Sequence, residues 1–158
     1  MINKVLGVEP GSTRTNIAML VLRLGLGVLM LVHGLPKMEM LFSGQPIQFP
    51  PVLGMSATTS LALAVFAEVA CSLLIIIGLA TRYAAIPLAI TMVVAVFLIH
   101  AADPFNVKEM GIHYLLGYLV LIIGGSGKYS VDYLMVRSKF KSYHPAIRPE
   151  DPTLSIYQ

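Results

Sequence analysis

The sequence has few charged residues, a single cysteine and no tryptophan. Only 12% of its 158 residues are charged, whereas 56% are hydrophobic. A soluble domain carries roughly 25% charged residues, so the sequence has too little charge to cover a soluble surface. So many apolar residues exclude a disordered chain, and the lone Cys71 excludes a disulfide scaffold. The composition therefore predicts a protein with much of its surface in lipid.

The net charge of +3 does not indicate a nucleic-acid-binding protein. No basic run with interleaved aromatic residues is present, and most Lys and Arg residues stand beside apolar segments. Membrane topology explains this distribution better. We therefore expect the lipid bilayer, and not nucleic acid, as a partner.

Four long apolar stretches organise the chain. They cover residues 15–34, 57–80, 84–102 and 111–126. The fourth is extended backwards through Lys108 and Glu109 to reach the ~20 residues that span a bilayer. The short link at 81–83 makes the second and third stretches antiparallel neighbours. The fold class predicted is an all-α membrane protein, a four-transmembrane-helix bundle over residues 15–128 that follows an N-terminal segment, 1–14.

Two segments are predicted to lie outside the bundle. Four prolines within 36–56 indicate an ordered loop with at most a short interfacial helix. Ser130 is placed to cap a helix that runs to residue 141, with tyrosine and basic residues suited to the headgroup region. Residues 144–158 are expected to form an extended tail. The region 129–158 is thus predicted as a cytoplasmic interfacial helix and polar tail.

Lys and Arg are divided unequally between the two sides of the predicted bundle. Eight lie on one side and two on the other, and the more basic side faces the cytoplasm. We expect both termini in the cytoplasm and the 36–56 loop on the exoplasmic side of a prokaryotic inner membrane. The eight are Lys4, Arg14, Arg82, Lys128, Arg137, Lys139, Lys141 and Arg148, and the two are Lys37 and Lys108.

Arg23 and Glu68 are charged residues inside predicted spans. A charge at bilayer depth costs about 2.5–3.5 kcal/mol, so each needs a partner or water. At about 1.5 Å per residue their depths differ by about 8 Å, a gap that an arginine side chain can close. We expect a structural ion pair between Arg23 and Glu68 that fixes helix register. Ser72, one turn from Glu68, is expected to serve helix packing rather than a polar path.

A second polar group is predicted at the exoplasmic end, where His33, His100, Asp103, Glu109 and His113 fall at or near one level. Histidine with a carboxylate suits a quinone, whose tail enters between helices and whose head group needs donors and proton carriers. The sequence has no CxxCH or HExxH motif, so neither an intrinsic cofactor nor a metal site is predicted. The catalytic candidates are His33, Glu109 and His113, and the candidates for contact with the ligand are His33, Lys37, His100, His113 and Tyr114.

Three segments in order resemble the DoxX family of membrane proteins. They are LRLGLGVLMLVHGLPK from Leu22, EVACSLLIIIGLATRYAAIPLAITM from Glu68, and Glu109 followed by YLLGYLVLIIGGSGKYSVD. The resemblance implies a four-helix bundle in a bacterial or archaeal membrane. Named members are linked to quinol oxidation, to thiosulfate:quinone oxidoreductase and to oxidative-stress complexes, usually as one subunit. The matching positions are Arg23, His33, Gly34, Lys37, Glu68, Arg82, Glu109, Gly125, Gly127 and Asp132.

These observations predict a membrane subunit of a respiratory or redox complex that contacts quinone or quinol, with any redox cofactor supplied by a partner. Two alternatives remain open. One is a non-catalytic structural or assembly subunit, and the other is a small transporter with Arg23 and Glu68 along a polar route. Enzymatic activity is not decided by the sequence.

Overall fold

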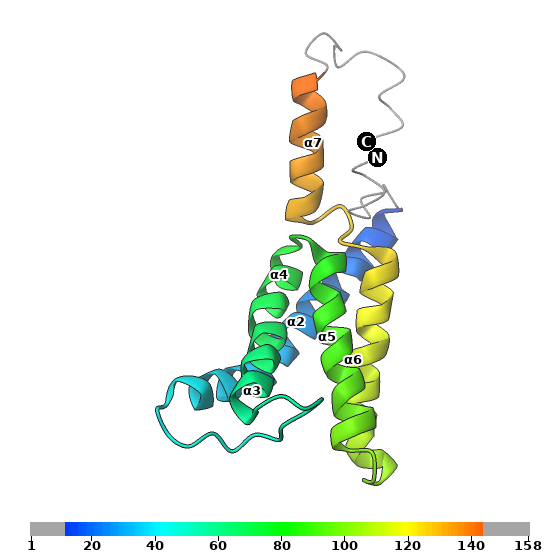
Figure 1. Ribbon diagram of the computed structural model, residues 1–158. Coiled ribbons are helices and arrows are strands. Elements are labelled where there is room, and N and C mark those ends of the chain that lie inside the picture. The colour runs from blue at the N-terminus through cyan, green and yellow to red at the C-terminus, as the bar shows by residue number, and fades with distance from the viewer. Residues whose placement is uncertain (1–11, 144–158) are drawn as a thin grey trace.

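The computed structural model describes residues 12–143, and within them every regular element is a helix. Four helical segments in this range are long and apolar enough to cross a membrane: Thr13–Phe42, Ala57–Ile77, Thr81–Ile99 and Phe105–Gly124. They stand together as a bundle, and a further helix projects beyond one end (Figure 1). The predicted all-α fold with four spans is confirmed.

The first span, α2 (Thr13–Phe42), is longer than the sequence predicts. Ser12 caps its start, because the Ser12 hydroxyl accepts a hydrogen bond from the Thr15 amide at 3.3 Å. The sequence places its end near Pro36, yet the helix continues through this proline. Proline removes one backbone donor, and spanning helices tolerate that loss where neighbouring groups compensate. The loop to the next helix is correspondingly shorter, 43–56 instead of 36–56.

The second span is α-helical at both ends and π-helical in the middle. It consists of α3 (Ala57–Val65), η1 (Phe66–Cys71) and α4 (Ser72–Ile77). The helix stops at Gly78, which has a left-handed backbone with φ 74°. The next helix already begins at Thr81, so the predicted link at 81–83 is wrong and the turn lies at 78–80.

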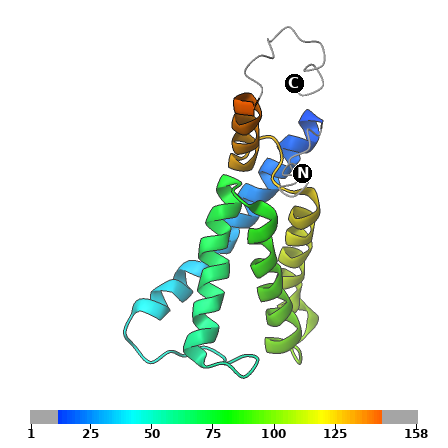
Figure 2. The same cartoon turned by 45° about the horizontal axis from the view of Figure 1, so that its top comes forward.

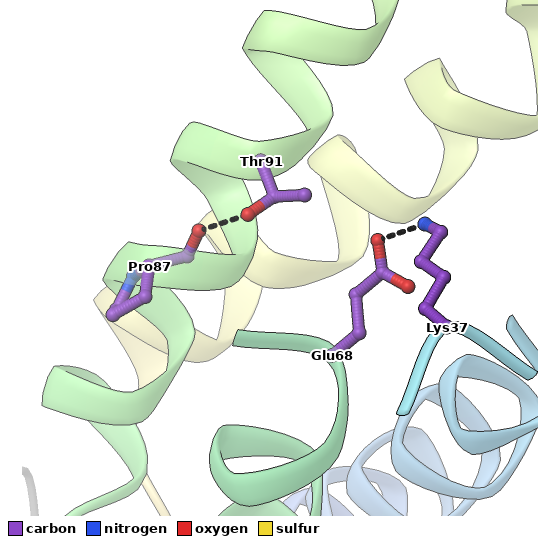
Figure 3. Close-up of polar contacts among 4 residues, drawn as sticks. All are labelled: Lys37, Glu68, Pro87 and Thr91. Atoms are coloured by element: carbon purple, nitrogen blue, oxygen red, sulfur yellow. Dashed lines mark hydrogen bonds and ion pairs between the residues drawn. The ribbon is translucent and has the colours of Figure 1, made fainter. Parts of the chain in front are cut away.

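The third and fourth spans pack against each other as a hairpin. The third consists of α5 (Thr81–Val94) and a second π-helical turn, η2 (Ala95–Ile99), and the fourth is α6 (Phe105–Gly124). Pro87 lies within α5, where the Thr91 hydroxyl donates a hydrogen bond to the Pro87 carbonyl at 2.9 Å (Figure 3). The core between the spans includes Leu88, Tyr118 and Leu121, all fully buried.

The helix α7 (Val131–Tyr143) follows the bundle. Its predicted cap is confirmed, because the Ser130 hydroxyl accepts a hydrogen bond from the Tyr133 amide at 3.2 Å. In both views α7 extends past the end of the bundle where α2 begins, rather than folding back across it (Figures 1 and 2). The predicted tail at 144–158 and most of the predicted segment 1–14 lie outside the described residues.

Candidate binding cavity between the helices

A cavity of about 210 Å³ lies between the spans, toward the end of the bundle that carries the 43–56 loop. Its walls come from α2, α5, the two π-helical turns and α6, together with His100 just after η2. Methionine and small apolar side chains make up the rest of the wall. The polar lining residues are His33, Lys37, Glu68, His100, Lys108 and Tyr114.

Both π-helical turns contribute to this cavity. Glu68 comes from η1, and Ala95 and Val96 come from η2. Single π-helical turns inside α-helices are rare and are often found at functional sites. Two of them at one cavity mark this region of the bundle as the candidate site.

Glu68 forms an ion pair with Lys37 across the cavity wall. The Lys37 Nζ donates to the Glu68 Oε1 at 2.5 Å (Figure 3). The Glu68 residue is 1% exposed, whereas the Lys37 side chain is 31% exposed. Gly34 makes the approach possible, because a Cβ at that position would lie 3.0 Å from Glu68 backbone and Cβ atoms. A buried carboxylate thus meets a cation at the edge of the cavity.

The predicted ion pair between Arg23 and Glu68 is wrong, because Arg23 faces the opposite end of the bundle. Its Nη2 donates to the Tyr129 carbonyl at 2.6 Å. The depth difference of about 8 Å is not closed by the arginine side chain, whereas Lys37 is available to Glu68 once α2 continues past Pro36. Arg23 therefore belongs to the closure of the other end.

That closure joins the chain after α6 to the turn between α4 and α5. The Asp132 carboxylate accepts hydrogen bonds from the Ala80 amide at 2.8 Å and the Thr81 amide at 3.3 Å. A carboxylate at the first turn of α5 also complements the helix dipole. Arg23 lies near enough to interact electrostatically with Asp132. Charged groups here hold helices together and do not line the cavity.

A line of rings leads from the cavity into the core. The His33 and Tyr114 rings meet edge to face with centroids 5.9 Å apart, and Tyr114 stacks with Tyr118 at 6.1 Å. His33 is exposed, Tyr114 is half-buried and Tyr118 is fully buried. The rings thus run from the accessible side of the cavity inward along α6.

The structure brings only some of the predicted site residues together. His33, Lys37, His100 and Tyr114 line the cavity, whereas Glu109 and His113 are exposed and do not. The helical period explains the difference, since Lys108, Gly111 and Tyr114 occupy the face of α6 that looks into the cavity. The predicted trio of His33, Glu109 and His113 therefore does not assemble there.

Among residues 12–143, no three His, Cys, Asp or Glu side chains are grouped so that they could hold a metal ion. His100 instead contacts Asp103, with 2.7 Å between its Nδ1 and a carboxylate oxygen. Both side chains of this pair are exposed, and of the two residues only His100 lines the cavity.

Sequence reasoning missed Lys108 as a lining residue and Lys37 as the partner of Glu68. Lys108 Nζ donates to the Ala101 carbonyl at 2.7 Å, which holds it at the cavity. The spacing of residues in the sequence could have indicated the role of Lys37. Lys37 follows His33 by four positions on one face of α2, a relation hidden by the assumption that Pro36 ends the helix.

The lining offers both donors and acceptors to a ligand. Two lysines and one glutamate give it a formal charge of +1 with both histidines neutral. Ammonium groups donate only, an ionised carboxylate accepts only, and neutral imidazole does both. Such a cavity can hold a polar or anionic head group while apolar parts of the ligand contact the methionines.

The fold and this cavity together define a four-helix membrane protein with a polar cavity between its spans. Residues 18–101, just over half of the chain, match the DoxX family, and the protein belongs to that family. The match includes the cavity residues of α2, η1, α5 and η2 and stops before α6.

One relative is an uncharacterized protein of Haemophilus influenzae. It is 39% identical over 66 residues, which are 39% of this chain and 44% of that protein. The chain thus matches less than half the length of this curated relative. No solved structure matches the chain.

Proposed function

We propose that the protein is a membrane subunit of a respiratory or redox complex and that its cavity binds the head group of a quinone or quinol. The observation that carries this proposal is the ion pair of Lys37 and Glu68 in the wall of a cavity between spanning helices. A charge pair at such a position has a desolvation cost, which favours a functional interpretation over a purely structural one.

The lining suits the two oxidation states of such a head group. Quinone oxygens accept hydrogen bonds, and Lys37 and His33 can donate them. Quinol hydroxyls donate, and the Glu68 carboxylate can accept them. Met30 and Met92 provide an adaptable apolar surface for the ring, and the isoprenoid tail would pass between helices into lipid.

We assign proton exchange to Glu68 and His33 and contact with the head group to Lys37, His100 and Tyr114. Glu109 and His113 are left out because they do not line the cavity. The chain has no dinucleotide fingerprint, cysteine cluster or haem-attachment motif, so we place the redox cofactor on a partner subunit. This chain would bind and orient the quinone and hold its protons.

We further propose that the protein lies in a prokaryotic cytoplasmic membrane with the cavity toward the exoplasmic face. The uneven distribution of basic residues supports this orientation. Arg14, Arg82, Lys128 and Arg137 lie at the end of the bundle closed by Asp132, whereas Lys37 and Lys108 lie at the cavity. Both termini would then face the cytoplasm.

Quinone binding by the purified full chain in lipid nanodiscs tests the proposal. Saturable binding of a short-chain ubiquinone or menaquinone analogue is expected, measured by equilibrium dialysis. His33→Ala should weaken it about tenfold, the equivalent of one hydrogen bond of about 1.4 kcal/mol. His113→Ala is the matched control, because His113 lies on α6 outside the cavity, and it should change the affinity less than about twofold.

Absence of saturable binding to the wild type would overturn the quinone proposal. It would favour the structural or assembly subunit. Equal affinities of the wild type and both variants would move the quinone site away from this cavity.

A further inference from the structure

Three buried polar atoms, one on Glu68 of the cavity wall and two on core residues, have no hydrogen-bond partner among the described residues. They are the Glu68 Oε2, the Ser72 Oγ and the Tyr118 Oη. Glu68 is 1% exposed, and both Ser72 and Tyr118 are 0% exposed. Neither lipid nor bulk water reaches these atoms directly.

The three atoms belong to one region of the core. Ser72 follows Glu68 by four positions, so the two residues lie about one turn apart on the same side of the second span. Tyr118 belongs to the core cluster that contains Ala67 and Cys71, the neighbours of Glu68 and Ser72. The charge of Glu68 acts on the Tyr118 phenol as well. These groups therefore continue the polar wall of the cavity inward.

Leaving such groups unpaired is energetically costly. Each unsatisfied buried polar atom costs about 1–3 kcal/mol, and proteins rarely accept that cost three times in one place. Buried water commonly satisfies groups of this kind and makes about three hydrogen bonds. A carboxylate oxygen accepts from water, a phenol donates to it, and a serine hydroxyl does either. The three groups together supply the donors and acceptors that a bridging water molecule needs.

We propose that Glu68, Ser72 and Tyr118 form an internal water site that extends the cavity into the bundle core. Water at this site solvates the Glu68 oxygen that Lys37 does not contact. Ser72 then has a polar role, which differs from the packing role expected from the sequence.

The site also gives Glu68 a route for proton exchange, and this role rests on the proposed binding of quinol. A proton passing from a quinol hydroxyl to the Glu68 carboxylate could move on to the internal water. Tyr118 and the stacked Tyr114 lie along the same side of α6. The internal water would thus give a proton from the ligand a hydrogen-bonded path into the core, and this path does not cross lipid.

Transfer of magnetisation from water to tyrosine rings tests the site directly. The full chain, in lipid bilayers and labelled with ¹³C-tyrosine and ¹³C-leucine, is measured by water-edited solid-state NMR, and Tyr118→Phe assigns the Tyr118 signals. We expect transfer to Tyr118 at a rate within about twofold of that to Tyr129, which is 46% exposed and lies outside the four spans. Ser72→Ala should reduce transfer to Tyr118 several-fold, whereas Ser138→Ala on exposed α7 should not change it.

Transfer to Tyr118 as slow as transfer to Leu121, which is 0% exposed and apolar, would overturn the internal water site. So would unchanged transfer in Ser72→Ala. No quinone is present in this experiment, so its failure is distinguishable from a failure of the proposed function. Fast transfer from water to Tyr118, combined with no quinone binding in the dialysis experiment, would support the internal water site and overturn only its role in proton exchange with quinol.

Discussion

Lys37 is the residue on which the buried charge of Glu68 depends. Their ion pair satisfies one carboxylate oxygen of a residue that is 1% exposed. Removing one partner of a buried pair leaves an uncompensated charge, which costs more than the pair itself contributes. The two side chains should therefore behave as one unit in mutagenesis.

Replacing Lys37 with methionine should lower the free energy of unfolding by about 3 kcal/mol. Thermal unfolding of the full chain in detergent measures the effect. Lys108→Met is the control, since Lys108 also lines the cavity but donates to a backbone carbonyl. Adding Glu68→Gln to Lys37→Met should restore much of the loss. No recovery in the double variant would contradict the coupling of these side chains.

Asp132 should matter for stability through backbone amides. Its carboxylate accepts from the Ala80 and Thr81 amides at the start of α5. Asp132→Asn should cost about 1–2 kcal/mol, because the asparagine amide has one acceptor oxygen instead of two and leaves one of the two backbone amides facing another donor. Asp103→Asn is the control, because Asp103 contacts His100 at an exposed position and should change stability by less than about 0.5 kcal/mol. Chemical unfolding followed by circular dichroism measures both, and equal losses would argue against the cap.

The sequence predicts several of the residues that line the cavity, but it does not predict which of them form an ion pair. His33, Lys37, His100 and Tyr114 are predicted from the sequence and line the cavity. Glu109 and His113 are predicted from their depth and their spacing of four residues, and neither fixes the direction in which that helix face points. Pairing Glu68 with Lys37 requires knowing that α2 continues past Pro36.

At the scale of elements, α2 approaches the second span through glycines. Gly27 and Gly34 are buried, and a Cβ at either position would come close to backbone atoms of that span. Small residues allow spanning helices to approach in this way. Gly25 faces open space, because no atom lies within 4 Å of the place that its Cβ would occupy.

These glycines offer a matched pair of substitutions. Gly34→Ala should destabilise the bundle by about 1–3 kcal/mol, because the added methyl group overpacks against Glu68. Gly25→Ala should be neutral or stabilising by up to about 1 kcal/mol, since alanine favours a helix. Thermal unfolding of both variants decides the point. Equal changes in the two variants would mean that helix propensity, and not packing, controls this face.

Hydropathy locates the four spans because each needs about 20 apolar residues. It does not locate their ends. Pro36 is an expected end for α2 and Thr81 an expected link residue, yet α2 passes through Pro36 and Thr81 begins α5. At α5 the start depends on a tertiary contact, because Asp132 accepts from the Ala80 and Thr81 amides, and at α2 a proline does not by itself end a spanning helix.

At the scale of the whole molecule, the cavity and the charged closure lie at opposite ends of the bundle. Lys37 and Glu68 belong to the first, and Arg23 and Asp132 to the second. This separation agrees with the proposed orientation, in which the closed end faces the cytoplasm.

Variants with one added cysteine test that orientation. Gln48→Cys lies in the exposed loop after α2, and Ser138→Cys lies on exposed α7. A membrane-impermeant maleimide should label Gln48→Cys in intact cells and Ser138→Cys only after permeabilisation. The native Cys71 is buried and should stay unlabelled in both variants. The reverse labelling pattern would show that the cavity end faces the cytoplasm.

The π-helical turns also set the phase of each span. A π-helical turn accommodates an extra residue relative to the α-helical turns around it. In genetic terms, η1 corresponds to a one-codon insertion in the second span. Deleting one codon within it would remove the extra residue and leave the downstream faces nearly unchanged, whereas winding the same residues as a regular α-helix would rotate everything downstream by about 100°. Such a rotation would turn the buried Ser72 and Ile75 out of the core, so the face that α4 presents to α2 depends on the extra residue being held in this one turn beside the cavity.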